Sequence, residues 1–290
     1  MSASTICMES NPIKPLLREA RIGEEDMRRI LGAAAREPDA ILVGGQSLAF
    51  WLLEMGLLDR DQRWSVTRDA DFFVARANRV DVVAAFAKAI SGSVVLPHEK
   101  ALTALIGQAV RFVSESEYLN VDVISRVAGT RKEDILRLAI PVEIAGIGTI
   151  RVVDPITLLQ SKVANLHKIP EKQNDMGIWQ AQLSILCVRE YLRRARARMP
   201  VRSDRDPMLK LIARIGDIAL GSAGRGVLRK FDVHPADAID PSVVTGKPFL
   251  EKRLPQLLPL MSSEWRARIA HLLEGSGNHV GPDFRGSRSM

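Results

Sequence analysis

The spacing of hydrophobic residues changes twice along the chain, and these changes separate three stretches. The first stretch combines helical spacing with short apolar runs, a pattern typical of strands that alternate with helices. The predicted elements are a helix over Ile22–Arg36, a strand over Ala40–Val43, a helix over Gln46–Met55, a strand over Asp69–Val74 and a helix over Val80–Ile90. The polar residues Asp59–Ser65 are predicted to form a loop.

The second stretch runs from Ser93 to Val153 and consists of short runs typical of strands. These runs are Val94–Leu96, Leu102–Ile106, Ala109–Val113, Leu119–Ile124, Val142–Ala145 and Thr149–Val153. The pair Gly107-Gln108 and the segment Gly146–Gly148 predict hairpin turns between neighbouring runs. We therefore expect a mixed sheet in which some strand pairs are antiparallel.

The third stretch begins after Asp154-Pro155 and is helical in spacing. The predicted helices are Ile156–His167, Asp175–Met199, Asp206–Leu220 and Glu264–Leu273. The sequence thus predicts an α/β domain over residues 21–154, with a mixed sheet flanked by helices, and an all-helical domain over residues 155–274. Residues 1–20 are expected to be an N-terminal extension, and the Gly- and Ser-rich residues 275–290 a disordered tail.

Composition narrows the class of protein. With 290 residues, of which 46% are hydrophobic, the chain can fill two ordinary cores, and its net charge of +7 favours a polyanionic partner. Its cysteines, Cys7 and Cys187, lie too far apart in sequence for a metal-ligand motif, which fits a reducing cytoplasm. The start of the chain lacks the pattern of a secretory signal, and the apolar stretch Leu48–Leu58 is shorter than the ~20 residues of a membrane-spanning helix. We expect no membrane partner.

The segment with the most chemical promise joins a glycine turn to a pair of acids. Gly44-Gly45 follows a short apolar strand and precedes a helix, so free backbone N–H groups at the helix start could hold a phosphate, with Ser47 nearby. Asp69 and Asp71 are separated by one residue, so on a strand their side chains leave the same face and can converge on one cation.

Asp122 is the candidate for a third carboxylate. It lies between Val121 and Val123 in a predicted strand, and burying an unpartnered carboxylate there is unfavourable unless something binds it. Metal ligation by Asp69, Asp71 and Asp122 would remove that penalty. The alternative is that these acids lie at strand ends in water.

The glycine turn, the acid pair and the later acid occur in the order found in the nucleotidyltransferase superfamily related to DNA polymerase β. The chain resembles that superfamily over about Ile41–Asp175, and most closely its AbiEii-type members, which are toxins of toxin–antitoxin pairs. Lys162 and Asp175 resemble a lysine and an acid that recur in that branch, although the role of Asp175 is left open. The resemblance implies a nucleotidyltransferase fold followed by a helical domain that binds the acceptor.

The resemblance also implies an activity. The protein would be a cytoplasmic Mg²⁺-dependent enzyme that moves an NMP from an NTP such as ATP to an acceptor hydroxyl, and its partners would include tRNA and a cognate antitoxin. Asp69, Asp71 and Asp122 would hold two Mg²⁺ ions. Gly44, Gly45 and Ser47 would hold the triphosphate, while Lys162 would neutralise phosphate charge. The alternative for Lys162 is an ordinary lysine on a solvent-facing helix surface.

Two other functions fit the sequence. One is a small-molecule nucleotidyltransferase that modifies an antibiotic, and the other is a non-catalytic nucleic-acid-binding or regulatory protein with the same fold. The basic run that includes Arg189, Arg193 and Arg196 could follow a phosphate backbone, or could equally be a solvated helix end. Asp154 before Pro155 is predicted to be a helix N-cap.

Overall fold

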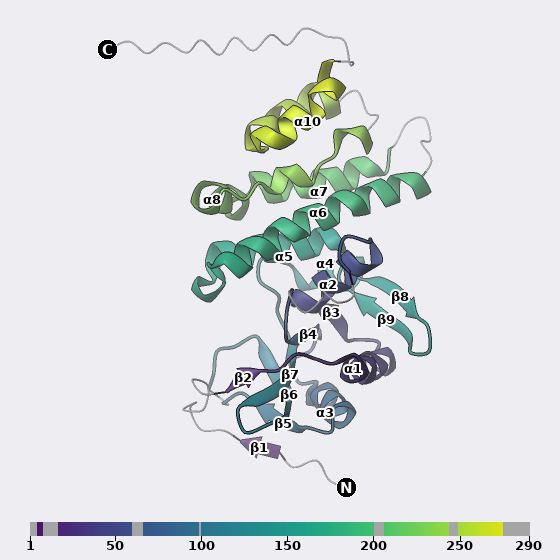
Figure 1. The fold of residues 1–290 in the computed structure, drawn as a ribbon, viewed down its shortest axis with the longest axis vertical. Helices are drawn as coiled ribbons and strands as arrows, with labels where there is room; N and C mark the ends of the chain where they lie inside the picture. Colours follow the sequence, from purple (N-terminus) through teal and green to yellow (C-terminus); the bar gives the residue numbers. More distant parts are fainter. Residues whose placement is uncertain are drawn as a thin grey trace, which may run out of the picture.

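The computed structural model describes residues 5–7, 17–59, 66–98, 100–199, 206–243 and 249–274. Most of the predicted loop Asp59–Ser65, much of the predicted N-terminal extension and the predicted tail 275–290 lie outside these residues. The described residues form a mixed sheet with helices on both faces, followed by a helical region (Figure 1). The predicted fold class is therefore confirmed.

The sheet has the order β1-β5-β6-β7-β4-β3-β9-β8, and β2 pairs with β7 off this path. Its strands are β1 (Thr5–Cys7), β2 (Arg18–Glu19), β3 (Ile41–Val43), β4 (Ala70–Phe73), β5 (Ser93–Leu96), β6 (Leu105–Phe112), β7 (Glu117–Ile124), β8 (Ile140–Ile144) and β9 (Gly148–Val152). The central strand β4 runs parallel to β7 and antiparallel to β3, while β6 is antiparallel to β7. The expected mixture of strand directions is therefore confirmed.

The helices fall into two groups along the long axis of the molecule (Figure 1). Those that accompany the sheet are α1 (Glu24–Arg36), α2 (Gly44–Glu54), α3 (Val80–Ala89) and α4 (Lys132–Leu138). Those of the C-terminal region are α5 (Pro155–Lys168), α6 (Asp175–Arg198), α7 (Met208–Leu220), α8 (Ser222–Phe231), α9 (Leu254–Leu257) and α10 (Ser263–Glu274). Short 3-10 or π turns connect several of them.

The two faces of β4 meet different surroundings. Phe72 stacks on Phe86 of α3, with ring centroids 4.4 Å apart, so this side chain points to the face covered by α3. Because side chains alternate along a strand, Asp71 and Phe73 point to the opposite face. That opposite face is the one on which the site described below is built.

Two separate groups of buried apolar residues support the two regions. One contains the inner faces of the sheet strands and helices α1 to α3, and the other is built from α5 to α10. Asp154 caps α5 between them by accepting hydrogen bonds from the N–H groups of Ile156 and Thr157, and it forms an ion pair with Arg214 at 3.0 Å. The predicted N-cap is confirmed.

Most predicted elements of the sheet region form within two or three residues of their expected ends. The predicted hairpin at Gly107-Gln108 is wrong: β6 continues through both residues, with only a local shift in its pairing to β7 between Leu105 and Gly107. Gly107 instead packs closely, since a Cβ there would lie 3.0 Å from the side chain of Leu96. The hairpin turn at Gly146–Gly148 is confirmed by the antiparallel pair β8 and β9.

The three arginines considered for a phosphate backbone have partners within the protein. Arg189 donates to the carbonyl oxygen of Asp237 at 2.7 and 2.9 Å and stacks over Trp265. Arg193 and Arg196 form ion pairs with Asp240 at 3.1 Å and with Asp206 at 2.9 Å. These contacts give the three side chains structural roles in the helical region, and contact of the basic run with nucleic acid stays a prediction.

None of the helices in the described part of the chain combines the length and the apolar character needed to cross a membrane.

The contacts of Arg189 predict that this side chain stabilises the fold, whereas the exposed Arg198 on the same helix should not. Replacing Arg189 with Gln removes two hydrogen bonds to Asp237 and the stacking on Trp265, so the free energy of unfolding should fall by about 1–3 kcal/mol. Arg198→Gln, on an exposed part of α6, should change it by less than about 0.5 kcal/mol. Urea denaturation measures both. Equal effects of the two substitutions would contradict the assignment.

Candidate active site

The glycine turn joins β3 directly to α2 and lies against the acid pair. Gly44 has a φ of 68°, and a Cβ on it would lie 1.8 Å from Oδ2 of Asp71. A Cβ on Gly45 would lie 2.4 Å from the side chain of Thr67. Both positions therefore require glycine. Because Gly44 has no side chain, the first turn of α2 can approach the carboxylate of Asp71.

Asp71 and Asp122 lie directly opposite each other in the parallel pair of β4 and β7. Directly paired residues of parallel strands share a face of the sheet. Asp69 comes one residue before β4. The side chain of Asp69 accepts a hydrogen bond from the hydroxyl of Thr67. Asp71 and Asp122 therefore share a face, and Asp69 lies close enough for its charge to raise the pKa of Asp71. That the three acids hold a cation together stays a prediction.

Amide side chains on the same face orient Asp122. Its Oδ1 accepts hydrogen bonds from Nε2 of Gln108 and Nδ2 of Asn120, both at 2.8 Å. Asn120 is only 3% exposed, and its own Oδ1 has no hydrogen-bond partner among the described residues. An orphaned oxygen of this kind is an acceptor available to a ligand or water.

A fourth acid, Glu19, joins the group from the short strand β2. This strand pairs with the start of β7, with Glu19 opposite Tyr118, so β2 and β4 follow one another along the same edge of β7. Burial and the negative charges of Asp69 and Asp122 raise the pKa of Glu19. No spacing in the sequence pointed to Glu19, whereas Asn120 could have been found, because it precedes Asp122 by two residues on the same strand face.

Lys162 reaches the acids from α5. It is 8% exposed, and its Nζ donates to Oε1 of Gln180 at 2.8 Å, while Nε2 of Gln180 donates to the carbonyl oxygen of Val66 at 2.6 Å. Burial lowers the pKa of Lys162 to about 8, although the neighbouring Asp71 opposes this shift. The alternative of a solvent-facing lysine is therefore wrong.

The acids outweigh the positive charge supplied to them. Burial raises the pKa of Asp71 to about 8, and the charges of Asp69 and Asp122 add to the increase, while Lys162 only partly offsets it. A group of carboxylates under mutual repulsion in a partly buried position gains stability from any cation that reaches it.

The carboxylate oxygens of this group are the kind of donor that suits a divalent cation with a preference for oxygen ligands. Carboxylate oxygens are the ligands that Mg²⁺ prefers, and neither His nor Cys is among the residues that gather here. Within the described part of the chain, however, no three acidic, His or Cys side chains are grouped closely enough to hold a metal ion as they stand. Binding of a metal ion would therefore require these side chains to change their arrangement.

Two further residues have defined positions. Ser47 is fully buried and its hydroxyl donates to the carbonyl oxygen of Gly44 at 3.0 Å, so it stabilises the turn in this arrangement. Asp175 is the exposed first residue of α6, next to the N-cap Asn174.

Comparisons with known proteins do not assign the chain to a family. No family model matches the chain, and no curated protein matches it. Among solved structures, the chain is similar to that of an inferred nucleotidyltransferase from H. pylori, with 16% identity over 88% of this chain and 96% of that one and a TM-score of 0.37.

The charge balance of the site predicts a pH-dependent effect of Asp71. With a folded-state pKa of about 8, against 3.8 ordinarily, the folded protein holds a proton that the unfolded chain has lost between about pH 4 and pH 8. Asp71 thus makes the fold less stable as the pH rises through this window. The lowered pKa of Lys162 acts only above about pH 8.

Asp71→Asn should therefore gain stability relative to the unsubstituted protein on going from about pH 5 to about pH 8. The measurement is urea unfolding of both proteins in buffer that contains a chelator. Asp81→Asn is the control, since Asp81 is exposed on α3 and its pKa is lowered by Arg79. A loss of stability in Asp71→Asn that grows with pH would show that the carboxylate is a structural partner.

Proposed function

We propose that the protein is a Mg²⁺-dependent nucleotidyltransferase of the DNA polymerase β-like superfamily that moves an NMP from an NTP to an acceptor hydroxyl. The observation that supports this most is the direct pairing of Asp71 with Asp122, on the face reached by the Gly44 turn and by Lys162. Phosphate-binding backbone, carboxylates and a buried cation thus meet at one place.

Each group has a role that follows from its chemistry. The backbone N–H groups at the start of α2 hold the β- and γ-phosphates, and Lys162 neutralises the charge that develops on the leaving pyrophosphate. Asp69, Asp71 and Asp122 would hold two Mg²⁺ ions, which supply Lewis acidity to the phosphoryl oxygens and lower the pKa of the acceptor hydroxyl. Gln108 and Asn120 hold Oδ1 of Asp122 through their amide groups.

The reaction balances without another reactant. The acceptor oxygen forms a bond to the α-phosphorus, the bond from that phosphorus to the bridging oxygen breaks, and pyrophosphate leaves with the electron pair. The acceptor proton passes to water. We propose tRNA as the acceptor and a toxin role with a cognate antitoxin, both on the strength of the AbiEii resemblance. The non-catalytic alternative rests on the basic run, in which Arg189, Arg193 and Arg196 have internal partners.

Transfer of label from NTP tests the proposal. The protein is incubated with Mg²⁺, an α-³²P-labelled NTP and a cell extract, and label is then measured in the RNA, protein and small-molecule fractions. Asp71→Asn and Lys162→Met should reduce incorporation by at least about 100-fold, since each removes charge stabilisation of the transition state. Lys88→Met, on the exposed surface of α3, should retain it. Equal incorporation with Asp71→Asn would contradict the assigned site.

Binding can be tested separately from transfer. An NTP that binds only the folded state raises the melting temperature, and the rise should require Mg²⁺ because the carboxylates alone repel the triphosphate. We expect the shift with the unsubstituted protein and with Lys88→Met, but not with Lys162→Met. A melting temperature that responds to none of the four NTPs with Mg²⁺ would exclude the proposed function.

A further inference from the structure

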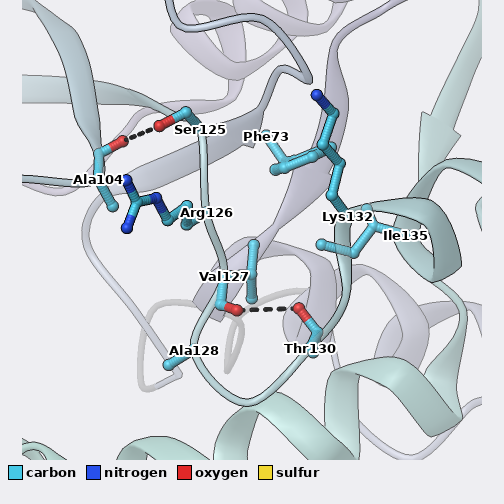
Figure 2. A pocket seen from close by; sticks show the side chains of 9 residues that line it. All are labelled: Phe73, Ala104, Ser125, Arg126, Val127, Ala128, Thr130, Lys132 and Ile135. Carbon is cyan, nitrogen blue, oxygen red and sulfur yellow. Dashed lines mark hydrogen bonds between the residues drawn. The ribbon is translucent and has the colours of Figure 1, made fainter.

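An open pocket of about 460 Å³ lies at the end of β4, and its lining includes Phe73, Arg126 and Lys132 (Figure 2). None of the acids lines it, and neither does Lys162 or the glycine turn. The pocket is therefore separate from the candidate active site. The geometry of that site depends instead on the residues that contact Lys162 and the acids directly.

Gln180 of α6 is hydrogen-bonded to two other parts of the candidate active site. Its Oε1 accepts a hydrogen bond from Nζ of Lys162 at 2.8 Å, and its Nε2 donates to the carbonyl oxygen of Val66 at 2.6 Å. Helix α5, which carries Lys162, packs along α6 (Figure 1). One side chain thus joins the buried cation of α5 to the segment that precedes β4.

The segment from Val66 to Asp69 extends these contacts to the glycine turn and the acids. The hydroxyl of Thr67 donates to Oδ1 of Asp69, and a Cβ on Gly45 would lie 2.4 Å from the side chain of Thr67. Val66 itself is fully buried. A shift of Val66 would move Thr67 against both the turn and Asp69, so this segment fixes Lys162, the turn and Asp69 relative to one another.

The two partners of Gln180 require an amide. Lys162 presents a donor and the carbonyl group of Val66 an acceptor, and the side chain of Gln supplies both an acceptor and a donor. A carboxylate in the same place would have no donor for Val66, and it would pair with the charge of Lys162. An ammonium group has three donors, so the bond to the neutral Gln180 leaves two of them and the full charge for phosphate oxygens.

We infer that Gln180 is a positioning residue, which holds the ammonium group of Lys162 at the triphosphate site and leaves its charge available to the phosphates. The inference rests on the proposed function, in which Lys162 neutralises charge on the leaving pyrophosphate. Stabilisation of a transition state depends on where the stabilising charge lies, and a small displacement reduces it strongly. Gln180 therefore acts on transfer through Lys162.

A double-mutant cycle tests the inference. Gln180→Leu removes both hydrogen bonds and should reduce kcat/KM for label transfer by roughly 10- to 100-fold, since a misplacement of about 1 Å can have an effect of this size. In the Lys162→Met background the same substitution should change transfer by less than about twofold, because the group that it positions is already absent. Gln182→Leu, on the exposed surface of α6, should leave kcat/KM unchanged. Equal losses from Gln180→Leu in both backgrounds would show a general structural role and overturn the inference.

A second substitution tests the requirement for a neutral side chain. Gln180→Glu keeps an acceptor for Lys162 but pairs with its charge, so transfer should again fall by at least about 10-fold. Full transfer by Gln180→Glu would overturn the inference.

A chemical measurement without nucleotide separates this inference from the proposed function. The rate at which Lys162 reacts with acetic anhydride is followed by mass spectrometry of peptides, with the exposed Lys88 as internal reference. Lys162 should react roughly fivefold faster in Gln180→Leu, the factor that loss of one hydrogen bond predicts, and at an unchanged rate in Gln182→Leu. An unchanged rate in Gln180→Leu would overturn the inference. Faster reaction in Gln180→Leu, with neither transfer nor an NTP-dependent rise in melting temperature in the unsubstituted protein, would count against the proposed function alone.

Discussion

The pairing of Asp71 with Asp122 across two parallel strands is the constraint on which the site depends. Their register places two acidic residues on one face of the sheet, on neighbouring strands whose backbones lie about 5 Å apart. Burial raises the pKa of the Asp71 carboxyl to about 8, and the charges of Asp69 and Asp122 add to the increase. A fold selected for stability alone would place apolar residues at these positions, as it does at Val121 and Val123 on the other face. A cation bound here would relieve the repulsion.

The buried cation of Lys162 offsets part of this repulsion, and hydrogen bonds from neighbouring helices hold it in place. Lys162 is held by Gln180, which in turn donates to the backbone at Val66, so α5 and α6 are both tied to the edge of the acid group. The helical region is therefore part of the site. Its arginines act in the same direction, because Arg194 donates to the carbonyl oxygens of Glu54 and Met55 at the end of α2.

The sequence predicted those features of the site that depend on side-chain alternation along a strand or on the backbone conformation of glycine. The spacing of Asp69 and Asp71 determines a shared face on any strand, and Gly44 is required wherever a helix start approaches a side chain so closely. The predictions that failed concern residues whose structure depends on partners distant in sequence. Gly107 looked like a turn, yet the pairing of β6 with β7 on one side and β5 on the other carries the strand through it. Arg189 looked free, yet its acceptor is 48 residues away. Glu19 could not be predicted, since it joins the acids only through pairing with the remote strand β7.

The distribution of charge carries more information than the net value of +7. Much of the positive charge is consumed in ion pairs such as those of Arg79, Arg111 and Arg196, and a paired cation contributes little to the field that a distant ligand meets. The cations that count are those beside an opening and without a partner. The net charge therefore does not by itself identify a ligand, because the cations paired in this way already stabilise the fold.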